Sequence, residues 1–281
     1  MKWLIIGIYL FSFVCVHLRG KRHLPLRQDL FGLSTVLAPI NVFIYLLSRA
    51  ASTPFVPPAN LPDIAQLSEN WQAIRAEAEN LRALRTKGLE SFYLKWYDSV
   101  LPSARGLCPR TSALLQSIPS IKLATFVDMR PGTRLEKHRD PYAGWLRCHV
   151  SLATPNDDAC FIEVDGQAYV WRDGQAMVFD ETYVHWAHNG CDTSRLILLC
   201  DIERPMRFRW AQAVNHFFGR MLSAAMNPPS GTAGHKGLTG ALFWIPRDIG
   251  RYRRRLRSWS MAGYRITVLT LVAGLAVLLS L

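Results

Sequence analysis

The sequence is poor in acidic residues and lacks any cysteine pattern, and both shortages narrow the classes of protein it can belong to. Its 281 residues include 21 aspartates and glutamates against 33 lysines and arginines, a formal net charge of +12. So large a basic excess calls for an anionic partner, either nucleic acid or a membrane surface. The six cysteines show no CxxC spacing and no disulfide framework. We therefore expect reduced, mostly buried thiols in a cytosolic setting.

Motifs for nucleic-acid binding and internal repeats are also missing from the sequence. The basic charge is concentrated in residues 247–265, which contain seven arginines and a single acidic residue, Asp248. This stretch runs directly into the apolar residues 266–281, and arginines beside an apolar helix are typical of contact with anionic lipid headgroups. We predict an anionic phospholipid surface and no nucleic acid as partner, and the sequence indicates no obligate protein partner.

Residues 3–18 are almost wholly apolar and are followed by the basic residues 19–23. A cleaved signal peptide is the competing interpretation, but the positive charge follows the apolar run and no small-x-small cleavage site is present. A retained membrane helix with its C-terminal end in the cytoplasm fits better, although it falls short of the about 20 residues that span comfortably. The apolar residues 33–47, interrupted by Pro39 and Asn41, are predicted to lie at or re-enter the membrane interface.

The pattern changes from helical to β along the middle of the chain. Apolar residues recur at helical spacing over 63–84, and a helical pattern returns over 207–225. Between them, turn signals such as Asp165-Gly166 separate short apolar runs, which predict a mainly β sandwich or barrel with flanking helices. The predicted strands are 92–97, 121–127, 145–152, 160–164, 167–171, 176–179 and 196–201.

Composition and pattern together predict three parts. Residues 1–51 form an N-terminal membrane anchor with an interfacial segment, and residues 52–225 form the folded domain. Residues 226–281 comprise a flexible linker, the basic juxtamembrane segment and a C-terminal membrane helix.

His138, Asp140 and His185 are the most informative polar residues. On an extended segment, residues i and i+2 point to the same side, so His138 and Asp140 could face one ion. His185 follows a predicted strand end, where ligands can face the mouth of a barrel. Two imidazoles and one carboxylate leave open positions on a ferrous iron. Zinc accepts the same ligands, so a zinc hydrolase is an alternative, and His188 could take the place of His185.

Arg195 begins the last predicted strand, ten residues after His185. A guanidinium offers a bidentate grip on a carboxylate, which a lysine does not match. If the ion is iron, an arginine on this strand could hold the distal carboxylate of 2-oxoglutarate.

The motifs around these residues resemble the aspartyl/asparaginyl β-hydroxylase family. The similar stretches are residues 131–133, 138–141, 146–152, 179–185 and 195–198. The resemblance implies a double-stranded β-helix (jelly-roll, cupin-like) oxygenase core that depends on Fe(II), 2-oxoglutarate and O2, with ascorbate as an optional reductant. It implies that His138 and His185 bind iron, and that Arg195 binds the side-chain carboxylate of 2-oxoglutarate. Arg147 and His149 match the RxH of the co-substrate pocket. The animal protein hydroxylases have glycine at the position of Asp140, whereas aspartate there would complete an ordinary triad.

The N-terminal segments are similar to those of bacterial lipid A hydroxylases, over residues 16–21, 37–41 and 52–54. That similarity implies hydroxylation at C2 of a secondary acyl chain of lipid A, at the cytoplasmic face of the bacterial inner membrane, by a cytoplasmic catalytic domain. Three alternatives stay open: a hydroxylase of another membrane lipid such as an ornithine lipid, a protein aspartyl/asparaginyl β-hydroxylase, and a non-catalytic membrane protein with a metal-binding sensor domain.

Overall fold

The computed structural model describes residues 2–84, 91–97 and 99–225. The described residues up to Ser223 fall into one compact unit. The predicted arginine-rich segment and C-terminal membrane helix lie outside the described residues, and the predicted three-part division stays a prediction.

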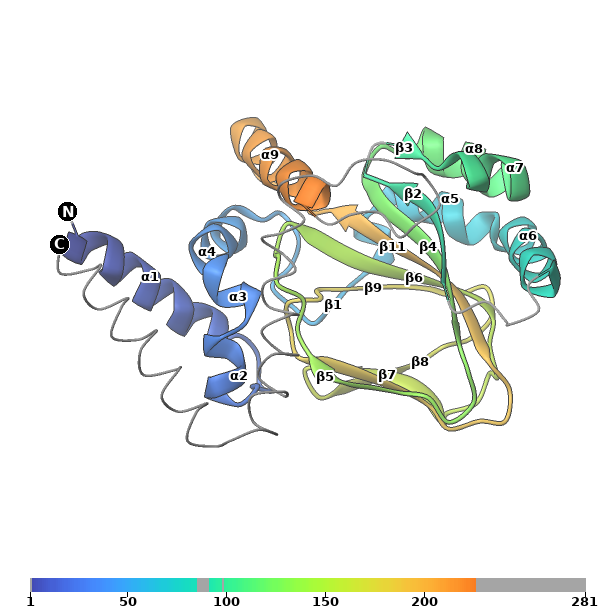
Figure 1. Ribbon diagram of the computed structural model, residues 1–281, viewed down its shortest axis with the longest axis horizontal. Coiled ribbons are helices and arrows are strands. Elements are labelled where there is room, and N and C mark those ends of the chain that lie inside the picture. The colour runs from blue at the N-terminus through green and yellow to red at the C-terminus, as the bar shows by residue number, and fades with distance from the viewer. Residues whose placement is uncertain (1, 85–90, 98, 226–281) are drawn as a thin grey trace, which may run out of the picture. The chain divides into compact units, whose positions relative to one another are not determined.

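Two antiparallel sheets face each other in this unit (Figure 1). The larger sheet has the order β1-β9-β6-β11-β4-β2-β3, and the smaller sheet has the order β5-β10-β7-β8. From β4 to β11 the chain passes back and forth between the sheets, and this strand order is that of an eight-stranded jelly roll. The predicted mainly β architecture with flanking helices is therefore confirmed.

The strands of the larger sheet are β1 (Phe55–Val56), β2 (Ser91–Trp96), β3 (Ser99–Val100), β4 (Ile121–Met129), β6 (Trp145–Ala153), β9 (Ala176–Phe179) and β11 (Arg195–Glu203). Those of the smaller sheet are β5 (Arg134–His138), β7 (Cys160–Val164), β8 (Gln167–Val170) and β10 (His185–Asn189). All the predicted strands are present. The pattern missed β5 and β10, because both are short and carry polar or charged residues at most positions.

The strand β6 shows how the period of two divides the core. Cys148, Val150 and Leu152 belong to the apolar cluster on the outer, helix-covered side of the larger sheet. The residues between them, His149 and Ser151, are also buried but point to the space between the two sheets. One strand thus supplies both the structural core and the polar interior.

Four helices cover the outer face of the larger sheet: α5 (Pro62–Glu69), α6 (Trp71–Leu84), α7 (Pro102–Leu107) and α8 (Pro109–Ser117), with the short 3-10 helix η1 (Pro58–Asn60) before them (Figure 1). The single helix predicted over 63–84 is in fact two. The Asn70 side chain donates to the carbonyl of Gln66 at 2.9 Å, an interaction that competes with helix continuation, and the chain turns there. The pattern also missed α7 and α8, which begin at Pro102 and Pro109, where proline suits the first helical turn.

The N-terminal helices α1 (Lys2–His17), α2 (Leu26–Leu30), α3 (Leu33–Val36) and α4 (Ala38–Leu47) lie at one end of the sandwich, beside β5 (Figure 1). The helix predicted over 3–18 is confirmed as a helix. However, α1 has only 16 residues, and no helix in the described part of the chain is long and apolar enough to cross a membrane. The expectation of a spanning N-terminal helix is therefore not supported, since a span needs about 20 residues.

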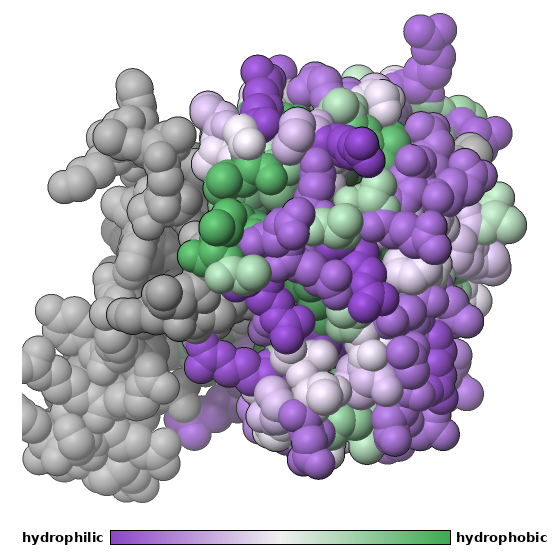
Figure 2. Space-filling view, turned by 90° about the vertical axis from the view of Figure 1, so that its right-hand side faces the viewer, coloured by the Kyte–Doolittle hydropathy of each residue, from purple (hydrophilic) through white to green (hydrophobic). Residues whose placement is uncertain are grey.

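Exposed apolar side chains gather on α1 to α4 and on α9 (Arg209–Ala225). The most exposed of them include Trp3, Phe11, Phe31, Leu46 and Phe217. The opposite face, at the end away from the N-terminal helices, is mainly hydrophilic (Figure 2). Apolar exposure on the described surface is therefore uneven, and it is highest at the end of the sandwich next to β5.

Candidate metal centre and co-substrate pocket

His138, Asp140 and His185 come together where β5 and β10 lie side by side. His138 ends β5, and it is directly paired with His185, the first residue of β10. Each of the three residues offers one ligand atom, and these atoms lie within 4.8 Å of one another. The backbone N–H of Asp140 donates to the carbonyl of Glu181 at 2.9 Å, which holds the loop after β5 against the turn before β10. The predicted cluster is thus assembled by strand pairing.

Both imidazoles are oriented through their Nδ1 atoms. Nδ1 of His138 lies 2.7 Å from the carbonyl oxygen of Glu136, and Nδ1 of His185 lies 2.9 Å from that of Tyr183. A carbonyl accepts only, so Nδ1 carries the proton and Nε2 keeps its lone pair for a metal. Burial lowers the pKa of His185 to about 4, against the opposing effect of Asp140, so its ring is neutral near pH 7. This donor set suits a divalent metal ion.

The alternative ligand His188 lies outside this cluster. It follows His185 by three positions on β10, so the two side chains point to opposite faces of the sheet. Its ring instead contacts Phe161, at 6.4 Å between ring centroids. Of the two histidines that the sequence left open, the structure brings His185 to the cluster.

Arg147 holds the carboxylate of the cluster in place. Its guanidinium contacts Asp140 at 2.5 Å, Glu181 at 2.6 Å and Asp201 at 2.9 Å. Burial alone would raise the pKa of Asp140, but Arg147 and His185 lower it to about 2, so Asp140 is ionised. The Arg147 guanidinium thus holds the ionised Asp140 carboxylate in a fixed position, where it can bind a metal ion.

The carboxyl groups around Arg147 differ in the direction of their pKa shifts. Burial raises the pKa of Glu181 well above its usual range, outweighing the lowering effect of Arg147, and Asp201 and Asp140 add to the rise. Among the described residues one guanidinium faces three carboxyl groups, and this favours the neutral form of Glu181. The sequence reasoning missed Glu181 and Asp201. Asp201 could be found only by knowing that β6 and β11 pair Arg147 with it.

A second polar group lies deeper between the sheets. His149, Ser151, Trp171 and Arg195 are all buried, and each has a side-chain nitrogen or oxygen with no hydrogen-bond partner among the described residues. The Arg195 guanidinium lies over the Trp171 ring at 4.2 Å and forms no ion pair within the described part of the chain. Burial lowers its pKa to about 10, which still leaves it charged near pH 7. A buried cation among unsatisfied polar groups requires an anion.

The metal cluster and this buried polar group are joined by a chain of side-chain contacts. The ring of Phe179 lies 5.3 Å from those of both His185 and His149, and His149 stacks on Trp171 at 6.0 Å. Burial lowers the pKa of His149 well below its usual range, with Arg195 and Arg147 adding to the effect, so its ring is neutral. The contacts thus run from His185 through Phe179, His149 and Trp171 to the unpaired Arg195. Trp171 and Ser151 were not predicted, because only the fold brings them beside Arg195.

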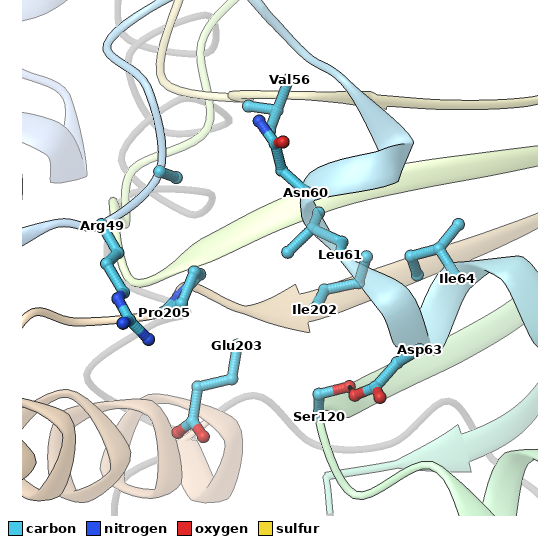
Figure 3. Close-up of a pocket in the computed structure, with 11 residues that line it drawn as sticks. Arg49, Val56, Asn60, Leu61, Asp63, Ile64, Ser120, Ile202, Glu203 and Pro205 are labelled. Carbon is cyan, nitrogen blue, oxygen red and sulfur yellow. Dashed lines mark hydrogen bonds between the residues drawn. The ribbon is translucent and has the colours of Figure 1, made fainter.

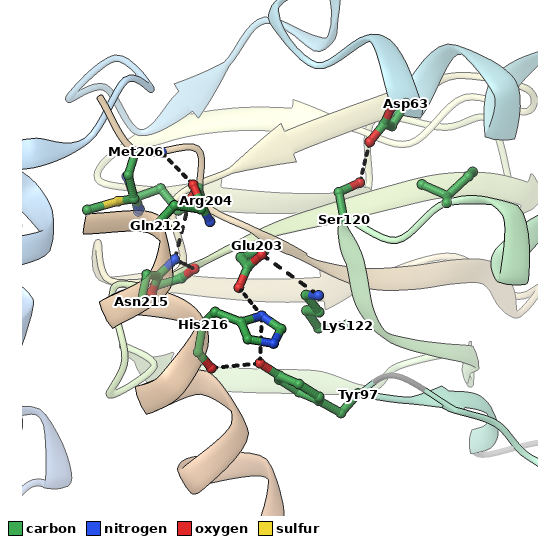
Figure 4. A network of polar contacts seen from close by, with 12 residues as sticks. Asp63, Tyr97, Ser120, Lys122, Glu203, Arg204, Met206, Gln212, Asn215 and His216 are labelled. Carbon is green, nitrogen blue, oxygen red and sulfur yellow. Dashed lines mark hydrogen bonds and ion pairs between the residues drawn. The ribbon is translucent and has the colours of Figure 1, made fainter. Parts of the chain in front are cut away.

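A separate hollow lies on the outer side of the larger sheet. Its volume is about 460 Å³, and it is lined by Arg49, Asp63, Ser120, Glu203 and several apolar residues (Figure 3). Two of the polar groups there have partners: Ser120 donates to Asp63 at 2.5 Å, and Glu203 accepts from His216 of α9 at 3.0 Å (Figure 4). None of the predicted site residues lines it. Its contacts join α5, β11 and α9, which is a structural role.

Fold and site together define a class of protein: a jelly roll with a two-histidine, one-carboxylate metal cluster beside a buried, unpaired arginine. Residues 68–205 match the model of the aspartyl/asparaginyl beta-hydroxylase family. The matched range contains all six predicted site residues.

Two curated relatives are informative. The chain is 32% identical over 180 residues to an ornithine lipid ester-linked acyl 2-hydroxylase of Rhizobium tropici, covering 57% of this chain and 64% of that protein. It is 28% identical over 211 residues to aspartate beta-hydroxylase domain-containing protein 2 of Rattus norvegicus, covering 66% of this chain and 61% of that protein. The chain thus spans less than two thirds of the length of these relatives.

Among solved structures, an oxidoreductase of the 2OG-Fe(II) oxygenase family from Burkholderia pseudomallei superposes with a TM-score of 0.32 at 12% identity, covering 47% of this chain and 78% of that one.

Proposed function

We propose that this protein is an Fe(II)/2-oxoglutarate-dependent dioxygenase that hydroxylates C2 of an acyl chain of a membrane lipid. The observation that carries the proposal is the chain of contacts that joins the metal cluster to the buried, unpaired guanidinium of Arg195. A metal-binding sensor or a zinc hydrolase would need the three ligands but has no use for a buried, unpaired cation behind them.

The proposed roles follow from the geometry. His138, Asp140 and His185 would hold the iron, and Arg195 would bind the distal carboxylate of 2-oxoglutarate with Ser151 and Trp171 as further donors. When bound, iron, 2-oxoglutarate and O2 supply the oxidising power that converts a C–H bond into an alcohol, with succinate and CO2 as the other products. The residues of the chain would position the reactants and exclude water from the site.

Arg147 and His149 retain the co-substrate roles that the family resemblance implies, but their contacts divide the work. His149 has both ring nitrogens free among the described residues, and its ring lies beside those of Trp171 and Phe179. Arg147 is already engaged by three carboxyl groups, so its first role is to hold Asp140. We propose that His149 contacts the co-substrate directly and that Arg147 acts mainly through the metal ligand.

A lipid substrate is supported by two observations. The relative from Rhizobium tropici is named for 2-hydroxylation of an ester-linked acyl chain. In addition, exposed apolar side chains gather on α1 to α4, at the end of the sandwich next to β5, where His138 lies, and also on α9. Such a surface suits contact with the acyl region of a bilayer, and the basic excess of the chain suits anionic headgroups. We propose action at the cytoplasmic face of a bacterial inner membrane.

Two lipids are the leading candidates. The N-terminal motifs favour a secondary acyl chain of lipid A, and the curated relative favours an ornithine lipid. Mass spectrometry of both lipid classes, extracted from cells with and without the gene, distinguishes them: the substrate class gains one oxygen atom on an acyl chain. The matched control is a strain producing the His138→Ala, His185→Ala protein at equal level. Unchanged spectra for every lipid would overturn the proposal, and succinate release driven by a peptide would point to a protein hydroxylase instead.

A further inference from the structure

We infer that the N-terminal helices α1 and α2 are part of the metal site, because Arg139, which stands between the ligands His138 and Asp140, positions the metal-binding loop through Asp29 of α2. This inference rests on the proposed function, since it takes the cluster to be a metal centre. It assigns a role in positioning the metal-binding loop to a segment that the sequence predicts only as a membrane anchor.

The contacts of Arg139 run away from the metal cluster and into the N-terminal helices. Its side chain is 2% exposed, its Nη1 donates to the carbonyl oxygen of Val16 near the end of α1, and its Nε lies 3.4 Å from Asp29. Asp29, whose side chain is 3% exposed, also contacts Nδ1 of His17 at 2.7 Å. Alternation along the chain explains the direction: when residues 138 and 140 face the metal, residue 139 faces the opposite side.

A second contact holds the other ligand-bearing segment. Arg19 follows α1 and lies 2.7 Å from Asp180, a fully buried carboxyl group that also contacts Arg204 at 2.7 Å. The Arg19 guanidinium is placed between the rings of Tyr45 and Tyr183, at 3.8 and 4.4 Å. Asp180 begins the turn that leads to His185, so the same N-terminal segment fastens the loops on both sides of the cluster.

A third contact fixes the chain between these two. The backbone N–H groups of Lys21 and Arg22 donate to the carboxylate of Asp165 at 2.6 and 2.7 Å. Gly20 precedes them with a φ of +85°, and a Cβ there would lie 2.6 Å from the same carboxylate. Only glycine allows so close an approach, so the path of the chain from α1 to the sandwich is closely defined.

Removing the charge of Asp29 should therefore be felt at the metal. A buried guanidinium that loses its carboxylate partner is costly to keep in place, because its charge is no longer compensated. Arg139 has no other carboxylate in contact among the described residues. It would move toward water and pull the backbone between His138 and Asp140 with it. Loss of an interaction that orients metal ligands commonly weakens metal binding by about 10- to 100-fold.

The test compares Co(II) binding to the full-length protein and to the variant Asp29→Asn, under anaerobic conditions, by titration of the visible absorption of the bound metal. We expect Asp29→Asn to bind Co(II) about tenfold more weakly and with an altered absorption spectrum. Glu77→Gln is the matched control. Glu77 accepts hydrogen bonds from the backbone N–H groups of Arg110 and Thr111, and so also pins two helices together, but on the outer side of the larger sheet. It should lower the melting temperature and leave the affinity and spectrum for Co(II) unchanged.

Arg139→Lys is measured in parallel and decides the question if Asp29→Asn does not fold, because lysine keeps the charge but cannot reach both Val16 and Asp29. Wild-type affinity and spectrum in both variants, or in Arg139→Lys alone if it is the one that folds, would overturn the inference. Failure of the unaltered protein to bind Co(II) at this cluster would instead overturn the proposed function.

Discussion

Asp140 is the residue on which the nature of the metal centre depends. Arg147 keeps the Asp140 carboxyl group ionised, and an oxygen of that group lies 3.9 Å from Nε2 of His138. A metal site made of two histidines alone would not need this carboxylate. The animal hydroxylases that the sequence resembles have glycine at this position, so the two designs make opposite predictions for one substitution.

We expect Asp140→Gly to weaken Fe(II) or Co(II) binding by at least about tenfold, because the cluster loses its only anionic ligand and leaves Arg147 facing the metal. Anaerobic metal titration with Asp201→Asn as control measures the effect, since Asp201 contacts Arg147 but is not among the three ligands. Unchanged affinity in Asp140→Gly would mean that the two histidines suffice.

Arg195 should act on the co-substrate and not on the metal. Loss of charge-assisted hydrogen bonds worth about 1.5–3 kcal/mol corresponds to a roughly 10- to 100-fold change in affinity. We therefore expect Arg195→Ala to raise the KM for 2-oxoglutarate by that factor while Co(II) affinity stays the same. Arg172→Ala, at a half-exposed arginine paired with Asp158, is the control and should change neither. Equal KM values for Arg195→Ala and the unaltered protein would contradict the assignment.

For single residues, the sequence predicts the candidate metal ligands but not the residues that hold them in place. The metal cluster could be anticipated from spacing and family resemblance, because its residue types are those that metals need. Trp171, Glu181 and Asp201 could not, because each matters only through what it lies against after the sheets have formed. A buried glutamate has no distinguishing signature in a single sequence.

Among the strands, too, some can be predicted from their own residues, whereas others form only through pairing with distant segments. Strands such as β6 and β11 are predictable because their own apolar residues indicate that they are buried. The polar strands β5 and β10 were not, because they become strands by pairing with each other and with β7. The pattern missed four of the described strands, β1, β3, β5 and β10, and the last two carry His138 and His185.

Two glycines in different elements, Gly174 and Gly106, test how the local backbone and packing affect stability. Gly174, in the turn before β9, has a φ of +78°, and a Cβ there would lie 2.9 Å from the ring of Trp71 on α6. We expect Gly174→Ala to lower the free energy of unfolding by about 1–2 kcal/mol, through backbone strain and displacement of the indole. Gly106→Ala in α7 meets nothing within 4 Å and should be neutral or stabilising. Urea denaturation of both variants measures the difference, and equal stability of the two would contradict this account.

For the whole molecule, the buried neutral histidine predicts how stability depends on pH. Burial holds the pKa of His149 well below its ordinary value of 6.5. As the pH decreases below about 6.5, the unfolded chain takes up a proton at His149 that the folded chain does not. The free energy of unfolding therefore decreases as the pH decreases, by up to about 1.4 kcal/mol per pH unit for one proton. His149→Gln should show a shallower loss between pH 7 and pH 5 in denaturant titrations. Parallel profiles for the two proteins would show that His149 is not neutral in the fold.

The division of β6 into two faces has a consequence for how this protein can change over evolutionary time. Arg147, His149 and Ser151 face the polar interior, while the residues between them face the helices. A single-residue insertion or deletion within this strand would exchange the two sets. The polar side chains would then point into the apolar core, and the thiol and aliphatic groups would point into the polar interior. The length of β6 therefore cannot drift by one residue without losing fold and chemistry together. Substitutions can still accumulate there one at a time, and tolerance of insertions is left to the turns and the outer helices.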